Sequence, residues 1–541
     1  MQNQALSTVL RKAEDFVEEG CRSIMEDGPL TDERYLISPC PVSTALAVMC
    51  LSTKPGKYRS HIKSGLDYLN TARNPDGGWG RTPRSPSDER STEVCRTALK
   101  CAESGVTSAS VKTVADNIGA TWLQDVPRLI LDWPSDAPVL KLLELFITNK
   151  TGSGLLVDVS FAHLPAVLAL LPPGGRPLIL ALSCMREAAR HKHSRALQSA
   201  VKKLASYRSA NGAWCEDILI TCLGILCLAI TGRHLQDRLS GLKWLASVQY
   251  RSGAWPSFNQ LTNWAIGLTS FAAGEILEGK GTLIEECARF LSVRANRDGS
   301  FGTLSPYAFP DLDDTAVALL GLNAALRHND SYAGPASRTA QLLVSLQNKD
   351  GSWATFPEVR GTPPACASLP PVHIKSVDVT VHVVQALLKS GTAINSPHIQ
   401  KGLWWLAFRQ KWDGSWKSTW YTGDAYATAQ VLELLAECGI RPNSRMRARN
   451  WLLAAQNENG GWPVGSAGEC GLALTALLKN GADPASPPVQ RGLAYISSRQ
   501  QADGAFTPAY GGLYASGLYY EDPITEALAA IRAITNYLKN K

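Results

Sequence analysis

The 541-residue sequence predicts an all-α fold assembled from repeated pairs of helices. A motif that combines an aromatic-aliphatic pair, a Gln or Arg, a Gly-containing turn and a final Trp or Phe recurs eight times. Segments rich in Ala and Leu, typical of helices, separate the copies, and strand signals are weak throughout. Helix pairs that repeat about an axis build either an open solenoid or a closed barrel, and a closed barrel leaves a central cavity.

The best copy of the motif is residues 401–416, KGLWWLAFRQKWDGSW. Final aromatics are 41 residues apart from Trp214 to Trp255 and 63 apart from Trp353 to Trp416, and a period near 45 accommodates a helix pair with its turn. Each helix should end near the Gln, and the Asp-Gly or Asn-Gly turn supplies positive backbone dihedrals. The final aromatic should fold back over the helix end, while the Gln bonds backbone of a neighbouring turn. The remaining copies end at Trp79, Phe301, Trp462 and Phe506.

Between the copies, helices are expected over residues such as 315–327 and 379–388, which are rich in Ala, Leu and Val. Composition is that of a globular protein, with 45% hydrophobic and 19% charged residues. The net charge is +7, and the one basic run, 186–195, reads as a solvated helix face, so no nucleic-acid partner is expected.

The thirteen cysteines are dispersed without a CxxC pair, which indicates reduced, buried thiols in a cytoplasmic protein. The N-terminus lacks the apolar core of a signal peptide. No run of eighteen apolar residues occurs, so no transmembrane segment is expected. The nearest approach, residues 163–185, is interrupted by Pro and Gly at 172–177.

The segment 310–316, PDLDDTA, places three carboxylates within four positions among apolar neighbours. Like charges so close cannot all ionise in a poorly hydrated site, so at least one proton should be retained above the usual aspartate pKa. Asp313 is flanked on both sides by Asp311 and Asp314, which makes it the candidate general acid. The structural alternative is a helix N-terminus capped by Asp311.

The repeats resemble the QW motifs of the superfamily of terpene cyclases, squalene-hopene cyclases and prenyltransferases, and PDLDDTA resembles the DxDD acid motif of class II terpene cyclases. A second segment, SVDVTVHVV at residues 376–384, is similar to the DVTAHV segment of squalene-hopene cyclases. The resemblance implies that Asp313 is the proton donor, flanked by Asp311 and Asp314, and that His382 orients and recharges it. A hydrogen-bond donor on Asp313 would also stabilise the carboxylate left behind.

The cation formed by protonation needs a cavity whose walls neither hydrate nor trap it, and aromatic faces meet that need. For any single aromatic residue, packing in the core is an equally good explanation. The candidates for the cavity wall are Trp264, Phe301, Tyr307, Phe309, Trp420, Tyr421, Tyr426, Tyr514, Tyr519 and Tyr520.

The resemblance implies two α/α-barrel domains, the β and γ domains of class II cyclases. Residues 1–20 plus 265–541 would form the β-type barrel with the acid, and 21–264 the inserted γ-type barrel. The substrate cavity would lie between them. The chain is shorter than squalene-hopene cyclases, ends differently at GGLYASGLYYEDP (511–523), and offers only 163–185 for peripheral membrane contact. These departures fit bacterial class II cyclases of prenyl diphosphates.

Such enzymes often carry an acidic motif in the second domain that helps to hold the diphosphate through Mg²⁺. The stretch 87–93, SDERSTE, is the match, with Asp88 and Glu89 as acids, and Arg81 and Arg90 could pair with phosphate. A solvated loop that leads into a helix explains the same residues. Mg²⁺ is therefore expected only if the substrate is a diphosphate, and no organic cofactor is implied.

The expected function is protonation-initiated cyclisation of a prenyl diphosphate, geranylgeranyl ahead of farnesyl, to a bicyclic diphosphate of copalyl or drimenyl type. The alternatives are cyclisation of squalene or another long isoprenoid, and a non-enzymatic helical-repeat scaffold. The DDxxD ionisation motif is missing, since Asp313-Asp314 is followed by Thr-Ala-Val-Ala, so the diphosphate should stay attached. A prenyltransferase-type zinc site is not expected, because no Cys and His show zinc spacing.

Overall fold

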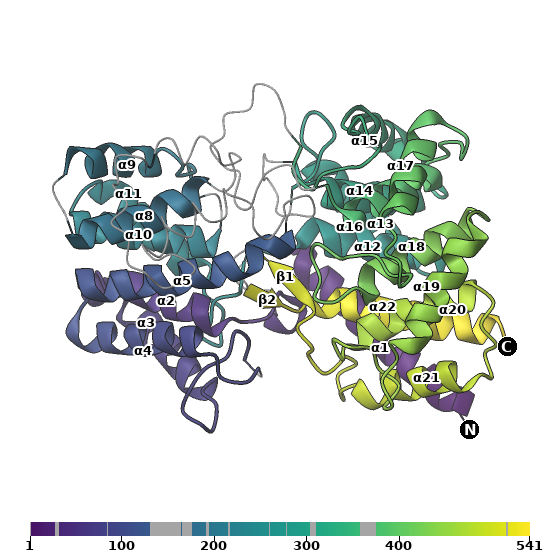
Figure 1. Cartoon of the computed structure of the whole chain (residues 1–541), viewed down its shortest axis with the longest axis horizontal. Coiled ribbons are helices and arrows are strands. Elements are labelled where there is room, and N and C mark those ends of the chain that lie inside the picture. The colour runs from purple at the N-terminus through teal and green to yellow at the C-terminus, as the bar shows by residue number, and fades with distance from the viewer. Residues whose placement is uncertain are drawn as a thin grey trace.

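The computed structural model describes the chain apart from residues 1, 27–31, 84, 130–163, 165–175, 191–193, 215–216, 259, 277–278, 303–309, 358–374 and 515–517. The predicted all-α class is confirmed: helices build both halves of the molecule (Figure 1). The core side chains form two large clusters. One draws on residues 40–255, and the other joins residues 6–35 to residues 265–537.

The helices around the first cluster are α2 (Pro41–Leu51), α3 (Pro55–Thr71), α4 (Glu89–Ser104), α5 (Ser108–Leu129), α8 (Arg176–Arg190), α9 (Arg195–Ala205), α10 (Ile218–Thr231) and α11 (Leu235–Ser247). Helices α2, α4, α5, α8 and α10 pack on one another in sequence and α10 returns to α2. Most of the segment 163–185 lies outside the described residues. No helix in the described ranges has the length and apolar character needed to cross a bilayer.

Around the second cluster the helices are α1 (Gln2–Met25), α12 (Thr262–Glu275), α13 (Gly281–Arg294), α14 (Leu312–Leu326), α15 (Ala333–Ser345), α16 (Val377–Lys389), α17 (Pro397–Phe408), α18 (Ala425–Glu437), α19 (Pro442–Ala454), α20 (Ala467–Lys479), α21 (Pro487–Arg499) and α22 (Pro523–Lys539). Helices α12, α14, α16, α18, α20 and α22 contact one another in that order, and α22 contacts α12. They are therefore a closed inner ring. The intervening helices and α1 cover its outside.

The repeated motif forms the turn that ends each outer helix. In the six copies that end in Trp, the indole N–H donates to the carbonyl ten residues earlier at 2.7–3.0 Å, as from Trp416 to Leu406. The Gln spans two turns: Gln410 donates to the carbonyls of Gly414 and Ser444, both at 2.9 Å. Gly414 has φ of +99°, a conformation that favours glycine. The folded-back aromatic, the bridging Gln and the positive turn dihedral match the expectations from sequence.

A short antiparallel hairpin, β1 (Gly512–Tyr514) and β2 (Leu518–Tyr520), lies between the two helical bodies (Figure 1). Gly512 pairs with Tyr520, and it also bridges Tyr421 of the second body. Tyr520 packs edge-on against Phe258, with ring centroids 4.7 Å apart. Weak strand signals did not predict this hairpin.

Candidate active site

The acidic segment starts α14, the second helix of the inner ring. Asp311 is its N-cap and accepts from the backbone N–H groups of Asp313 (2.8 Å) and Asp314 (3.4 Å). The backbone N–H of Asp311 donates to Phe301 at 2.8 Å, which ties the acid segment to a repeat turn. Asp311 is therefore the N-cap that the structural alternative predicted. The side chain of Asp313 takes no part in this cap.

His382 of α16 meets the side chain of Asp313. Its Nδ1 lies 2.6 Å from Asp313 Oδ1, and the two side chains are 5% and 14% exposed. Burial acts to lower the pKa of His382, but the Asp313 carboxylate and the hydrogen bond between them outweigh burial and raise it above its usual value. The sequence-predicted pair is thus in contact across 69 residues of chain.

The other two carboxyls hold their protons more tightly than ordinary aspartates. Burial, followed by the charge of Asp313, raises the pKa of Asp311 well above its usual range. Burial and then the charges of both neighbours do the same for the pKa of Asp314. The Oδ1 atom of Asp314 is buried and has no hydrogen-bond partner among the described residues. Crowded carboxyls therefore favour neutral forms around Asp313.

Asp378, one turn before His382 on α16, anchors the loop that carries an aromatic wall. Its Oδ2 accepts from the backbone N–H groups of Thr419 (2.7 Å) and Trp420 (3.0 Å). Burial raises its pKa to about 6, although the two N–H groups oppose that shift. The indole N–H of Trp420 donates to Thr355 at 2.9 Å. Trp420 is therefore held by both its backbone and its ring.

Two of the predicted aromatic residues contact His382, and a third stacks on one of them. The Trp264 ring centroid is 5.4 Å from that of His382, and its indole donates to Thr525 at 3.0 Å. The Tyr426 hydroxyl is 3.3 Å from His382 Nε2. Tyr421 stacks on Tyr426 with centroids 3.6 Å apart and planes at 10°. The side of the acid toward α12 and α18 is therefore walled by π systems.

The remaining predicted aromatics are placed differently. Phe301 is fully buried as a repeat aromatic in the core. Tyr307, Phe309 and the side chain of Tyr514 lie outside the described residues. Tyr519 points away from the acid, because neighbouring residues of a strand face opposite sides: Tyr520 feels the charge of Asp313, while Tyr519 lines a cleft.

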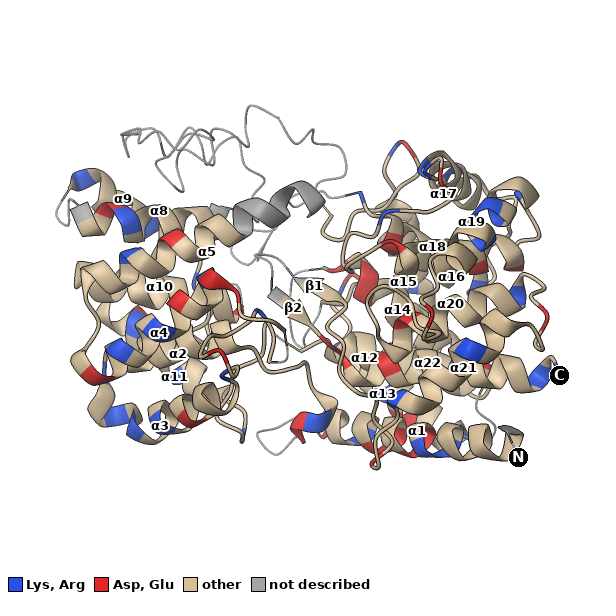
Figure 2. Cartoon of the chain, turned by 60° about the horizontal axis from the view of Figure 1, so that its bottom comes forward, with Lys and Arg blue, Asp and Glu red and all other residues tan. Residues whose placement is uncertain are grey.

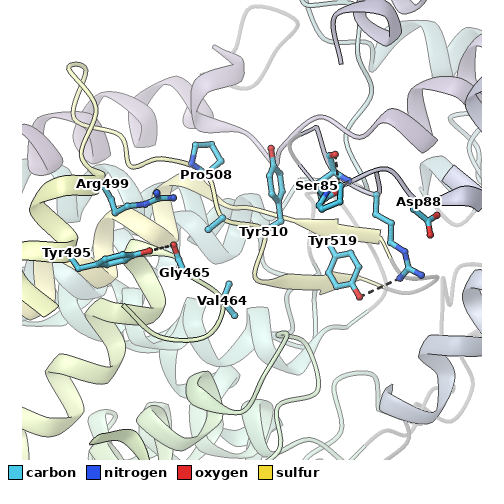
Figure 3. Close-up of a pocket in the computed structure, with 13 residues that line it drawn as sticks. Ser85, Asp88, Val464, Gly465, Tyr495, Arg499, Pro508, Tyr510 and Tyr519 are labelled. Atoms are coloured by element: carbon cyan, nitrogen blue, oxygen red, sulfur yellow. Dashed lines mark hydrogen bonds between the residues drawn. The ribbon is translucent and has the colours of Figure 1, made fainter. Parts of the chain in front are cut away.

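This cleft, of about 720 Å³, lies where the two bodies meet, with Arg499 near one end and Asp88 near the other (Figure 3). Arg81 Nη1 donates to the Tyr519 hydroxyl at 3.5 Å, and its guanidinium lies 5.6 Å from that ring. Asp88 caps α4 by accepting from Ser91 at 2.8 Å. The complete lining is Arg81, Thr82, Ser85, Pro86, Asp88, Val464, Gly465, Tyr495, Arg499, Pro508, Ala509, Tyr510 and Tyr519.

Glu89 and Arg90, predicted beside Asp88, sit in the first turn of α4 and are not part of this lining. In the described ranges, no three His, Cys, Asp or Glu side chains come together as a metal site would require. A Mg²⁺ ion in this cleft would therefore rely on Asp88 and on oxygens of a bound ligand. One carboxylate with substrate phosphates is a set that Mg²⁺ accepts.

Sequence reasoning missed several side chains at the site. Gln430 Nε2 lies 3.2 Å from His382 Nε2; it follows Tyr426 by one turn, so helical spacing from the tyrosine could have found it. Thr525 holds Trp264, and Arg499 lines the cleft. No local pattern marks these two, because their contacts are made between distant segments.

A small cavity of about 30 Å³ lies behind Tyr421 and Tyr426 and has Glu469 and Glu526 in its lining. That volume suits one or two water molecules. Burial raises the pKa of Glu469 to about 8 and that of Glu526 to about 7. Each accepts a backbone N–H, from Val464 (2.8 Å) and Gly468 (2.6 Å) respectively.

Comparison with known proteins extends this picture. Residues 292–471 match the family model of the squalene-hopene cyclase C-terminal domain, and residues 178–311 match the prenyltransferase alpha-alpha toroid domain. A squalene–hopene cyclase of Bradyrhizobium diazoefficiens is 29% identical over 36% of this chain and 34% of its own length. A drimenyl diphosphate synthase of Streptomyces showdoensis is 26% identical over 54% of each chain. The matches thus span between a third and about half of these relatives.

Among solved structures, the ent-copalyl diphosphate synthase of Streptomyces platensis superposes with a TM-score of 0.58 at 20% identity. The superposition covers 97% of this chain and 99% of that one, so the two proteins share the fold over their whole length. With the repeated turns and the acid segment at the start of α14, these matches make the chain similar to the squalene-hopene and class II terpene cyclases.

Proposed function

We propose that this protein cyclises a prenyl chain and that Asp313 starts the reaction by protonating a terminal alkene. The single observation that carries the proposal is the 2.6 Å hydrogen bond between Asp313 and His382 in buried surroundings. A carboxylic acid with a cationic or donating neighbour releases its proton more readily, since the carboxylate left behind is stabilised. The flanking acids, Asp311 and Asp314, add no competing negative charge while they stay protonated.

In the proposed step, the Asp313 O–H bond breaks and the alkene π pair forms a C–H bond at the CH carbon of the terminal alkene, not at its dimethyl-substituted carbon. The neighbouring carbon becomes a tertiary cation, and the next alkene attacks it to close a ring. Trp264, Tyr421 and Tyr426 would present π faces to positive charge without reacting with it. Loss of a proton to a base or attack by water ends the cascade. Much of the rate effect would come from folding the chain in advance and excluding water.

We infer that the substrate is a prenyl diphosphate, with geranylgeranyl ahead of farnesyl. The support is the cleft between the bodies, where Arg81 and Arg499 supply positive charge and Tyr510 and Tyr519 supply hydroxyls. Two of the similar proteins, a drimenyl diphosphate synthase and an ent-copalyl diphosphate synthase, support the same class of substrate. If Mg²⁺ accompanies the diphosphate, Asp88 would be its protein ligand, and the ion would neutralise phosphate charge. Retention of the diphosphate in the product follows from the missing ionisation motif.

The second candidate substrate is squalene or a similar long isoprenoid, and the squalene–hopene cyclase matches favour it. Incubation of the purified protein with geranylgeranyl diphosphate, farnesyl diphosphate and squalene, with product analysis by mass, separates the candidates. A bicyclic product that keeps both phosphates is expected, and its yield should fall on chelation of Mg²⁺. Free inorganic diphosphate as an early product would contradict the proposal.

We also propose the division into a barrel of residues 1–20 plus 265–541 and an inserted barrel of residues 21–264. The two separate cores support it. They also suggest that the first boundary between the barrels lies after residue 20. Helix α1 continues to Met25, and Tyr35 still packs in the core that contains the acid segment.

A further inference from the structure

The outward side of α17 carries large aromatic side chains in solvent. Trp404, Phe408 and Trp412 are 49%, 79% and 84% exposed, and within the described chain they are the only large aromatics so exposed. Trp404 and Phe408 are one turn apart and stack with ring centroids 5.9 Å apart. Met446 on neighbouring α19 is 57% exposed. Solvent-facing aromatic clusters of this kind mark interaction surfaces.

The other repeats provide an internal reference, because the final aromatic and its Gly-containing turn align all copies, and in the six Trp copies the indole-to-carbonyl bond spans the same ten residues. Counting back from each final aromatic, the position of Trp404 is taken elsewhere by Asp67, Lys202, Lys243, Arg289, Gln341, Asn450 and Ala494. The position of Phe408 is taken by Thr71, Ser206, Ser247, Val293, Ser345, Ala454 and Ser498. The position of Trp412 is taken by Pro75, Ala210, Arg251, Arg297, Lys349, Glu458 and Ala502.

No other copy has an aromatic residue at any of the three positions. The repeat fold therefore does not require these side chains, since seven copies form the same turn without an aromatic residue at these positions. What distinguishes the copy at 401–416 is its surface. A role outside the fold of this chain is the physical reason for keeping two Trp and a Phe in water, where each costs hydrophobic free energy.

Positive charge is concentrated around the same aromatics. Residues 397–416 and 441–450 together contain seven Lys and Arg and one Asp, a net charge of +6, whereas the whole chain has +7. The Arg441 guanidinium lies 4.0 Å from the centroid of a Trp404 ring. The partners of Arg445 and Arg447 are neutral amide oxygens of Asn480 and Gln410. Figure 2 shows basic residues along α19 beside α17.

We propose that this surface, formed by Trp404, Phe408, Trp412 and the arginines of α19, docks on an anionic phospholipid bilayer. Indole and phenyl rings insert at the level of the headgroups, while the guanidinium groups reach the lipid phosphates; this combination typifies interfacial helices. The charge complementarity selects an anionic lipid surface over a neutral one and over an apolar protein face. Because docking is a property of the outer surface, the proposal stands independently of the cyclase reaction.

The test is sedimentation of the full-length protein with vesicles of phosphatidylcholine alone and of phosphatidylcholine with one quarter phosphatidylglycerol. The wild type should sediment with the anionic vesicles and much less with the neutral ones. The variant Trp404→Gln, Phe408→Ser, Trp412→Ala, which carries residues found at the aligned positions of other repeats, should bind at least about tenfold more weakly. The double variant Arg441→Gln, Arg447→Gln should lose the preference for anionic vesicles. Each substitution should weaken binding to those vesicles by about fivefold.

Val293→Ser is the matched control, since Val293 occupies the position of Phe408 in another copy and is 76% exposed. It should bind vesicles as the wild type does. Unchanged circular dichroism and melting temperature would show that the triple variant is folded. Wild type that stays in the supernatant with both vesicle types would overturn the proposal, as would a triple variant that sediments normally. A dimer of the wild type in light scattering that the triple variant lacks would assign the surface to a second copy instead.

Discussion

At the scale of single residues, the three aspartates of the acid segment have separate tasks. Asp311 caps the N-terminus of α14, and Asp314 is buried in the first turn of this helix. Asp313 remains accessible on one side and is bound by His382 on the other. The crowding that the sequence displays therefore serves two ends: it starts a helix, and it surrounds one acid with two carboxyls of raised pKa.

Asp313→Asn should abolish cyclisation without unfolding the protein. The amide keeps the shape and can still contact His382, but it has no acidic proton to give, so product formation should fall by about a thousandfold or more. Mass analysis of product and a thermal melt check this. The matched control is Asp298→Asn, because Asn459 occupies the equivalent turn position of another repeat. Appreciable turnover by purified Asp313→Asn would exclude this residue as the acid.

The pH dependence of stability should reveal the buried carboxyl of Glu469. Its folded pKa is about 8 and its ordinary value is 4.5, so the folded state binds the extra proton. The stability that this group contributes is complete below pH 4.5 and is lost as pH rises through 8. In thermal melts at pH 5, 7 and 9, the melting temperature of Glu469→Gln should rise relative to that of the wild type as pH increases. A constant difference at all three values would contradict this, and the exposed Glu458→Gln is the control.

At the residue scale, the sequence predicted those site residues that lie within short local motifs. The acid segment and the His382 segment were recognisable because each keeps its chemistry within a few neighbouring positions. Thr525 and Arg499 were not predicted, since their roles arise only when separate segments meet, whereas Gln430 was missed although it follows Tyr426 by one helical turn. Among the aromatics, Phe301 could not be told from a wall residue by sequence, because a repeat aromatic and a cavity aromatic look alike.

At the scale of elements, a repeat turn that carries a Gln is closed by this side chain, which also connects it to the next outer helix. Gln456 donates to Gly460 at 3.0 Å and to Pro488 at 2.9 Å. The contact within the turn follows from a short stretch of sequence and the repeated pattern implied the neighbouring one, so the turns were predictable. The hairpin at residues 512–520 was not, because its strands are held by Tyr421 and by packing between the two bodies.

Gln456→Ala should destabilise the protein by about 1–2 kcal/mol, because two hydrogen bonds are lost and their carbonyls are left partly buried. Denaturant unfolding followed by circular dichroism measures the change. Gln341→Ala is the control: among the described residues this exposed Gln bonds only Ser337, so its loss should cost less than about 0.5 kcal/mol. Equal effects of the two substitutions would show that the hydrogen bond between neighbouring turns adds nothing to the free energy of unfolding.

At the scale of the whole molecule, two helical bodies meet at a cleft with the hairpin between them. The hairpin directs Tyr519 to the cleft, whereas Tyr520 turns toward the acid side. A long substrate with a charged head could therefore place its head and tail on opposite sides of one short ribbon. The two-barrel class was predictable from repeats and resemblance, but the presence of Arg81 and Arg499 in the lining of one cleft depends on tertiary placement.

Arg81→Ala should raise KM for a prenyl diphosphate by about tenfold or more, with a smaller effect on kcat, because a charge-assisted contact to the diphosphate is lost. Steady-state kinetics with the diphosphate substrate measures both constants. Arg73→Ala is the control, since Arg73 lies over Trp79 and bonds Gly77 away from the cleft lining. An unchanged KM would place the phosphate groups elsewhere.

Helix α1 packs on α22 and α12, and Gln500 of the last repeat donates to the carbonyl of Val9 at 2.8 Å. The acid-bearing ring therefore gains part of its outer cover from a helix that is made long before α22 and Gln500, its partners near the end of the chain. On the ribosome, α1 has to wait for nearly the entire chain, including an independent core, before it can dock on α22 and the last repeat. Newly made protein should accordingly stay vulnerable to proteases along α1 until translation is almost finished, and holding chaperones would have their main task during that interval.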